Sequence, residues 1–345
     1  MQSVFPLASM VGSVLGLSMR RREFITLPGG TVVAWPLAAR AQQTGIPVIG
    51  FLNPTTPEAL AEPMRGLRQG LKDAGFVEGE NLTIEYRWAD NQAERPQAMA
   101  AELVRRRVSL IVATGGGQAP LAAKAATTAL PIVFNTADDP VSLGLVASLA
   151  QPGGNVTGVS ILATELTAKR LELLHALAPN AIRIAVFINP GEPAGDVALR
   201  ELEAAGVAIG LQTRILRTST DREIDAAFAS FVHERPDALF VAGSGLFLSR
   251  RVQLSLLAAF HRVPTIFSLR ELAEAGGLMS YGASLRVAYR QVGVYAGRIL
   301  KGEKPTDLPV VQASKFELVI NAQTARMLGL TVPSTLLSVA DEVIE

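Results

Sequence analysis

The chain of 345 residues contains no cysteine. This absence excludes disulfide bonds, thiol nucleophiles, cysteine-ligated metals and a lipid-modified N-terminal cysteine. Histidine is also scarce, and His175, His233 and His261 are too far apart in the sequence to show the spacing of metal ligands. The sequence therefore predicts neither a metal site nor a bound cofactor.

The chain also lacks an excess of charge of either sign, because its formal net charge is only +1. Domains that bind nucleic acid are usually strongly basic, so we expect no nucleic-acid partner. Apolar residues make up 49% of the chain and charged residues 18%, which is enough apolar material for a full core. The length suits two domains of ordinary size.

Catalytic motifs are missing as well. The sequence has no serine elbow, no histidine beside a candidate nucleophile and no convincing pair of carboxylates. The triple glycine at 115–117 is not followed by Lys-Ser/Thr, so it is not a phosphate-binding loop. A tight strand-to-helix turn with a close backbone approach explains it better. We therefore expect a protein that is not an enzyme.

The N-terminal segment has the order of an export signal. Arg21 and Arg22 are followed by an apolar segment at 27–37, and Ala39-Arg-Ala41 is a small-x-small cleavage site. The arginine pair indicates the twin-arginine route. We expect residues 1–41 to be this signal.

Two alternatives bear on this segment. An apolar stretch precedes the arginines, so Met19 is a better start than Met1. A membrane anchor would need about 20 apolar residues, whereas Pro28 and Pro36 interrupt a shorter run. We therefore predict a protein that is exported to the periplasm and, having no cysteine to carry a lipid, is free there.

From residue 46 onward, apolar runs alternate with amphipathic stretches, including a helix expected after Pro140 up to Leu149. Such alternation predicts an α/β fold with parallel sheets and helices on both faces. The pattern also repeats, since Phe51-Leu-Asn-Pro is echoed by Phe187-Ile-Asn-Pro. We therefore predict two doubly wound parallel-sheet lobes, joined by a hinge strand at 151–160.

We expect lobe one to comprise residues 42–155 plus 285–345, and lobe two residues 156–284. Lobe two already has a full set of strands by residue 281, so the tail is surplus to it. The tail should cross back and pack on lobe one.

Polar residues lie where the predicted strands end. In open parallel sheets, ligands bind outside the carboxyl ends of the strands. The candidate ligand-binding residues are Asn53, Thr114, Gly115, Asn135, Thr136, Asp139, Ser160, Asn189, Ser244, Ser268, Arg270 and Tyr281. Most are uncharged donors and acceptors, which suits a small polar ligand.

Several of these candidates have a structural alternative. Asn53 and Asn189 could only cap the helices that follow them, and Asp139 could do the same before Pro140. Arg270 could be a solvated side chain. The sequence alone leaves both roles open for each residue.

The strand-end and hinge motifs resemble a known family. Pro131-Ile-Val-Phe, Asp139-Pro-Val and Pro152-Gly-Gly-Asn-Val-Thr-Gly-Val-Ser160 are similar to ABC transporter substrate-binding proteins of the tryptophan- and phenylalanine-binding group. Segments 300–305 and 316–321 also look like the tail of that family.

The resemblance implies a type I periplasmic-binding fold and ligand contacts from a subset of the candidates. These are Asn53, Thr114, Thr136, Asp139, Ser160, Asn189 and Tyr281. One departure is Gly243-Ser244-Gly245, where amino-acid-binding members tend to have a Thr-Asp-Asn-like turn. A ligand's amino group would lose an anionic partner there.

The resemblance implies a function in import. We expect a monomer that binds a small polar ligand, amino-acid-like or another small carboxylate, between two lobes by hinge closure. Its partners would be an ABC permease and its ATPase. Two other classes stay open, namely a ligand-sensing input protein for a membrane receptor and a secreted enzyme.

Overall fold

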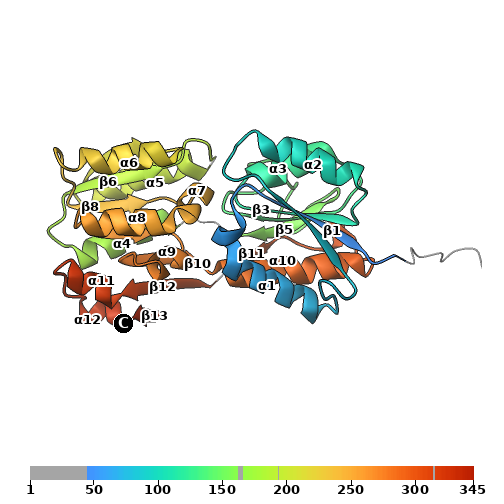
Figure 1. The fold of residues 1–345 in the computed structure, drawn as a ribbon. Helices are drawn as coiled ribbons and strands as arrows, with labels where there is room; N and C mark the ends of the chain where they lie inside the picture. The colour runs from blue at the N-terminus through green and yellow to red at the C-terminus, as the bar shows by residue number, and fades with distance from the viewer. Residues whose placement is uncertain (1–44, 162–165, 193, 314) are drawn as a thin grey trace, which may run out of the picture. The chain divides into compact units, whose positions relative to one another are not determined.

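The structure is a computed structural model that describes residues 45–161, 166–192, 194–313 and 315–345. The predicted export signal at 1–41, with its alternative start at Met19, lies outside the described residues. Two β-sheets, each with helices around it, make up the rest (Figure 1).

The first sheet has six strands in the order β11-β5-β4-β3-β1-β2, and its paired strands are parallel. The strands are β1 (Val48–Asn53), β2 (Thr83–Trp88), β3 (Leu110–Thr114), β4 (Ile132–Thr136), β5 (Val156–Ser160) and β11 (Val311–Gln312). Four helices accompany them, namely α1 (Ala61–Asp73), α2 (Arg95–Arg105), α3 (Gln118–Ala126) and α10 (Leu285–Leu300). In Figure 1, α2 and α3 cover one face of this sheet, and α1 and α10 cover the other.

The second sheet has seven strands in the order β13-β12-β10-β9-β8-β6-β7. They are β6 (Arg183–Ile188), β7 (Gln212–Arg217), β8 (Ala238–Val241), β9 (Thr265–Phe267), β10 (Met279–Ala283), β12 (Phe316–Asn321) and β13 (Glu342–Ile344). Strands β10 and β12 pair antiparallel, and the other pairs of this sheet are parallel.

Helices surround the second sheet as well. They are α4 (Thr167–Leu177), α5 (Ala194–Ala208), α6 (Asp221–Ser230), α7 (Gly245–Ser249), α8 (Arg251–Phe260), α9 (Arg270–Glu274), α11 (Ala322–Met327) and α12 (Ser334–Leu337). Two short 3₁₀ helices, η1 (Pro57–Leu60) and η3 (Pro305–Asp307), complete the described elements. Parallel strands covered by helices on both faces are the doubly wound arrangement that the sequence predicts.

Local sequence explains where these elements form. All residues of β3, Leu-Ile-Val-Ala-Thr, are buried, as a continuous apolar run in a parallel sheet should be. Helix α6 begins with a capping box, in which the Thr220 hydroxyl accepts from Glu223 N and the Glu223 carboxylate accepts from Thr220 N. The helix expected after Pro140 does not form, since turns occupy 140–144.

The strands of the two sheets do not follow the lobe boundaries that we predicted from the sequence. Strand β5 pairs with β4 and β11 of the first sheet, although we began lobe two at Val156. Strand β12 pairs with β10 of the second sheet, although we assigned the whole tail to lobe one. Helix α10 packs against α1 of the first sheet. The tail is therefore shared between the two sheets. The prediction was wrong because an antiparallel pairing between distant segments leaves no mark in a pattern of parallel strand-helix units.

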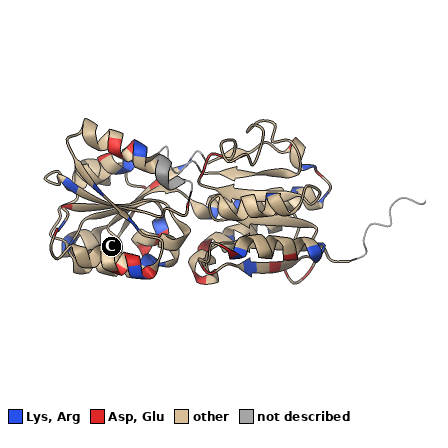
Figure 2. Cartoon of the chain, turned by 90° about the horizontal axis from the view of Figure 1, so that it is seen from above, with Lys and Arg blue, Asp and Glu red and all other residues tan. Residues whose placement is uncertain are grey.

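We call the first sheet with its helices lobe one, and the second sheet with its helices lobe two. The chain passes between them after β5, between β10 and α10, and between β11 and β12. Figure 2 shows Lys and Arg interspersed with Asp and Glu over both lobes. The strand interiors carry mostly apolar side chains, so charge is concentrated on the helices and loops.

Candidate functional site

A cavity lies where the carboxyl ends of strands from both sheets come together. Its volume is about 70 Å³. Its lining combines small polar groups with apolar side chains, and consists of Asn53, Thr55, Leu60, Gly115, Gly116, Asn135, Ala137, Ile161, Glu192, Gly243, Ser244, Gly245, Leu248, Ser268, Leu269, Gly282, Ala283, Leu285 and Tyr289. Mostly apolar walls with a few convergent polar groups are typical of sites for small molecules.

The wall on lobe one is organised around Asn53, the last residue of β1. Its side-chain amide donates to Thr114 Oγ1 at 2.8 Å and to Tyr289 OH at 3.4 Å. Its carbonyl oxygen accepts from Thr55 N at 2.8 Å and from Thr55 Oγ1 at 2.7 Å. Asn53 is fully buried, so its amide holds three neighbours in place and shapes the wall.

The glycine turn after β3 forms the next part of this wall. Gly115 and Gly116 have φ angles of +92° and +84°, in the left-handed region that favours glycine. A Cβ on Gly115 would lie 2.7 Å from Pro54 Cδ and 2.8 Å from Asn53 Nδ2. The interpretation of this motif as a tight turn with a close backbone approach is thus confirmed.

The wall on lobe two is organised around the carboxylate of Glu192. Its Oε1 accepts from Ser244 Oγ at 2.8 Å, from Gly245 N at 2.9 Å and from Asn189 Nδ2 at 3.4 Å. Burial raises the pKa of Glu192 to about 7, and the nearby charge of Asp138 also raises it, while these hydrogen bonds lower it. The cavity therefore contains a carboxyl group that titrates near neutral pH.

The rims of the two lobes also contact each other directly. Gln118 Nε2, at the start of α3, donates to the carbonyl oxygen of Gly191 at 2.9 Å. Ser249 Oγ of α7 donates to Asn91 Oδ1 at 3.2 Å, and Arg251 of α8 donates to Glu58 O at 3.1 Å. These contacts join lobe one to lobe two beside the cavity.

Some of the predicted site residues line the cavity. They are Asn53, Gly115, Asn135, Ser244 and Ser268. Two more lie directly behind the lining, since Thr114 accepts from Asn53 and Asn189 donates to Ser244 Oγ at 3.1 Å. Strand-end position therefore identified part of the wall on each lobe.

The structure does not bring the other predicted residues to the cavity lining. Thr136 and Ser160 are buried, and both contact Asp138. Thr136 Oγ1 donates to Asp138 Oδ2 at 3.2 Å, and Ser160 Oγ donates to the backbone carbonyl oxygen of Asp138 at 3.4 Å. Asp139 is exposed and accepts from Val141 N at 3.0 Å, so it caps a turn.

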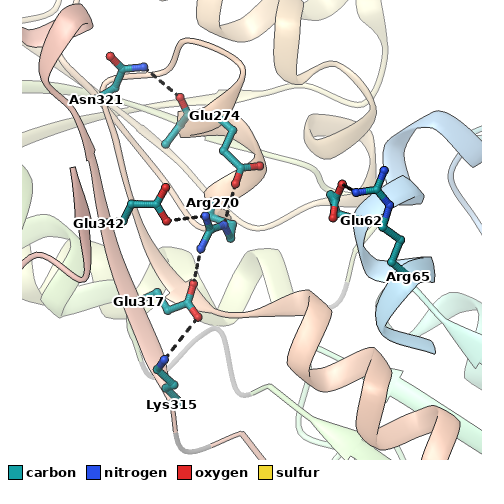
Figure 3. Close-up of polar contacts among 9 residues, drawn as sticks. Glu62, Arg65, Arg270, Glu274, Lys315, Glu317, Asn321 and Glu342 are labelled. Atoms are coloured by element: carbon teal, nitrogen blue, oxygen red, sulfur yellow. Dashed lines mark hydrogen bonds and ion pairs between the residues drawn. The ribbon is translucent and has the colours of Figure 1, made fainter. Parts of the chain in front are cut away.

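Arg270 and Tyr281 also lie elsewhere in lobe two. Arg270 is surrounded by three carboxylates, with Glu342 at 2.7 Å and Glu274 and Glu317 each at 2.9 Å (Figure 3). The ring of Tyr281 packs against Phe316, with the ring centroids 6.3 Å apart. Arg270 is the first residue of α9 and Tyr281 lies within β10, and neither lines the cavity.

The sequence reading missed several lining residues, of which Glu192, Thr55 and Tyr289 are polar. Glu192 and Thr55 each follow a repeated Phe-x-Asn-Pro motif, so their position after a strand end was a usable signal. Tyr289 comes from α10, far along the chain from the strands it joins, and no local pattern marks it. The remaining missed residues are apolar or glycine.

The described part of the chain contains neither a cluster of metal-ligating side chains nor a helix that could span a membrane. No three His, Asp or Glu side chains there are grouped so as to hold a metal ion. In residues 45–161, 166–192, 194–313 and 315–345, no helix has the length and apolar character needed to span a bilayer.

Comparison with known proteins identifies the family. The model of the ABC transporter substrate binding protein family matches residues 39–344. The chain belongs to this family. A curated member, the tyrosine-binding protein of Clostridioides difficile strain R20291, is 29% identical over 282 residues, which cover 82% of this chain and 81% of the relative.

Solved structures of other substrate-binding proteins agree with this assignment. The ABC domain from Streptococcus pneumonia in complex with L-Trp is 26% identical, has a TM-score of 0.78, and is matched over 87% of this chain and all (100%) of its own. A ligand-free, open substrate-binding protein from Clostridium difficile is 28% identical, with a TM-score of 0.61, over 87% of this chain and 99% of its own. The expected periplasmic-binding fold of two doubly wound lobes is confirmed.

Proposed function

We propose that this substrate-binding protein is the ligand-capturing component of an ABC importer, and that it binds a small amino-acid-like ligand or another small carboxylate between its lobes. The supporting observation is the cavity at the carboxyl ends of strands from both sheets. A ligand placed there contacts both lobes at once. Members of the family are binding proteins, and nothing in the mechanism requires a bond to be made or broken.

The cavity lining supports a ligand with an apolar body and a polar end. Leu60, Ile161, Leu248 and Leu285 supply apolar surface. Leu285 is also the first residue of α10, a helix of 16 residues, and the side chain of its N-cap residue Ser284 makes no capping hydrogen bond. Free N–H groups at a helix N-terminus suit a carboxylate. Tyrosine and tryptophan, the ligands named for two of the relatives, each carry a carboxylate on an apolar body.

The proposed mechanism is hinge closure. The three crossings between the sheets are the hinge, and the ligand favours the closed arrangement by binding it more tightly than the open one. We infer that a permease and its ATPase recognise the closed form of a monomer. We also infer that the twin-arginine signal at 1–41 directs the protein to the periplasm, and that the protein is free there, without a lipid anchor. We infer that it needs no cofactor.

Thermal unfolding of the full chain against a panel of amino acids, short peptides, purines and aromatic carboxylates tests this proposal. A ligand at a hundred times its dissociation constant should stabilise the folded state by about 2.7 kcal/mol. Ser268→Leu, which fills the cavity, should abolish the shift in melting temperature, and Ser338→Leu on the exposed surface should preserve it. Absence of a shift with every compound, or disappearance of the ligand during incubation, would contradict the proposal.

A further inference from the structure

The charge of the cavity lining is unbalanced. Among the described residues that line it, Glu192 is the one carboxylate, and none is lysine, arginine or histidine. A partly buried carboxylate without a nearby cation is costly to keep ionised, which is why burial is the main cause of its raised pKa. A cation brought by the ligand would remove this cost.

The Glu192 carboxylate is held in one orientation. Three groups of lobe two donate to its Oε1, namely Ser244 Oγ, Gly245 N and Asn189 Nδ2. Oε2 faces lobe one instead, since a Cβ on Gly116 would lie 3.8 Å from it. Gly116 has no side chain, so only its backbone approaches this oxygen, and both residues line the cavity.

A second carboxylate adds to the negative potential at this point. Asp138 follows β4 of lobe one and is 5% exposed, and its charge acts on Glu192 across the space between the lobes. Asp138 is also close to the glycine turn, because a Cβ on Gly117 would lie 3.1 Å from its Oδ2. Acidic groups from both lobes therefore converge on one side of the cavity.

We propose that Glu192 determines the specificity of the site for charge, and that its Oε2 binds a protonated nitrogen of the ligand, such as the α-ammonium group of an amino acid. This inference rests on the proposed function. It adds the chemical group of the ligand that the wall on lobe two recognises. A charge-assisted hydrogen bond from an ammonium group to a carboxylate is stronger than a neutral one and favours the closed arrangement.

A purely structural role for Glu192 makes a different prediction. If the side chain only holds the turn at Ser244 and Gly245, then any group that accepts their hydrogen bonds will replace it. Glu192→Gln keeps the size and an oxygen acceptor but removes the negative charge. This variant therefore separates recognition of a cation from support of the loop.

Isothermal titration calorimetry on the full chain, with amino acids and their deaminated analogues, provides the test. The pairs are L-tryptophan with indole-3-propionate, L-tyrosine with 3-(4-hydroxyphenyl)propionate, and L-leucine with 4-methylpentanoate. For the amino acid that binds, the wild-type protein should prefer it over its analogue by roughly 10- to 150-fold, as expected for a charged hydrogen bond. Glu192→Gln should reduce this preference to less than about 3-fold, because only the amino acid loses a partner.

The outcomes distinguish this inference from the proposed function. If the wild-type protein binds an amino acid and its analogue equally well, the inference fails and the proposed function stands; this comparison needs no variant. If Glu192→Gln is folded and keeps the full preference, the inference also fails. If no amino acid and no analogue binds, the proposed ligand class fails together with the inference. Glu192→Asp, which keeps the charge, should retain part of the preference.

Discussion

Gly70 of α1 lies so close to Arg290 of α10 that a Cβ on Gly70 would be 1.9 Å from the Arg290 carbonyl oxygen. The contact continues along both helices, because a Cβ on Gly66 would be 2.2 Å from Arg286 O and one on Gly293 would be 2.3 Å from Leu67 O. Glycine therefore allows the backbones of α1 and α10 to touch. This contact holds a helix from late in the chain against lobe one.

Gly70→Ala should destabilise the protein, because the methyl group has no space and the two helices must separate. Overpacking of this kind costs about 1–3 kcal/mol of stability. We expect a value near the upper end of this range, because the methyl group would meet backbone atoms, which cannot rotate away as a side chain can. Urea unfolding of the variant measures it. Gly45→Ala is the matched control, since nothing lies within 4 Å of its Cβ, and a similar loss in both variants would refute the packing argument.

Arg270→Ala should lower stability without changing ligand affinity. Its side chain is 28% exposed and pairs with Glu317, which is 12% exposed, and also with Glu274 and Glu342 (Figure 3). Removing the cation leaves three carboxylates close together, so we expect a loss of about 1–2 kcal/mol. Calorimetric unfolding and ligand titration together check this.

A surface ion pair shown in the same figure supplies the control. Arg65 pairs with Glu62 on α1, but its side chain is 69% exposed, so Arg65→Ala should change stability by less than about 0.5 kcal/mol. A clear fall in ligand affinity for Arg270→Ala would restore the original assignment of Arg270 to the binding site.

Gln118→Ala should accelerate ligand release. Its side chain donates to Gly191 O across the two lobes, so it stabilises their contact and contributes little to either lobe alone. Loss of one such hydrogen bond is worth about 1 kcal/mol, or roughly a five-fold increase in the dissociation rate. Stopped-flow displacement measures this rate. Gln69→Ala, which removes a hydrogen bond to Asp73 within α1, should leave it unchanged; equal rates in both variants would argue against closure through this contact.

Glu271→Gln should stabilise the protein at high pH. Burial raises the pKa of Glu271 to about 7, above its ordinary value of 4.5. The folded chain therefore holds this proton more tightly than the unfolded chain. The contribution of Glu271 to the free energy of unfolding is greatest below pH 4.5 and is lost as pH rises through about 7. Removing the charge should recover roughly 1–3 kcal/mol at pH 8.

Melting temperatures between pH 4 and 8 check this prediction. The difference between Glu271→Gln and the wild type should grow with pH. Glu80→Gln, at an exposed position, is the control for replacing a carboxyl group by an amide. A constant difference for Glu271→Gln would show that its carboxyl group does not titrate in this range.

Much of the fold was predictable, because buried parallel strands leave a direct mark on the sequence. The apolar run at 110–114 and its counterparts predicted the strands, and the repeat of Phe51-Leu-Asn-Pro at Phe187 predicted two similar lobes. Strand β12 was misplaced because its antiparallel pairing with β10, which comes much earlier in the chain, has no local signature. The expected helix after Pro140 fails in part because Gly144 has a φ of +68°.

The site was less predictable than the fold, because strand-end position says little about where a side chain points. Asn53 ends β1 and Arg270 begins the helix after β9, yet only the first lines the cavity, and the second lies in a cluster of carboxylates. Whether a residue faces the ligand depends on partners such as Tyr289 and Glu317, which come from distant segments. Those pairings exist only once the tertiary structure has formed.

Because of its helical periodicity, α10 lines the cavity with one face and packs against α1 with the neighbouring face. Leu285 and Tyr289 lie one turn apart and line the cavity, whereas Arg286, Arg290 and Gly293 lie on the neighbouring face against α1. The contact with α1 uses backbone carbonyls at 286 and 290 and a missing side chain at 293. Leu285 and Tyr289 therefore shape the cavity through their side chains, whereas the seating of α10 on lobe one depends on backbone atoms and a glycine, so one helix serves the two tasks with different residues.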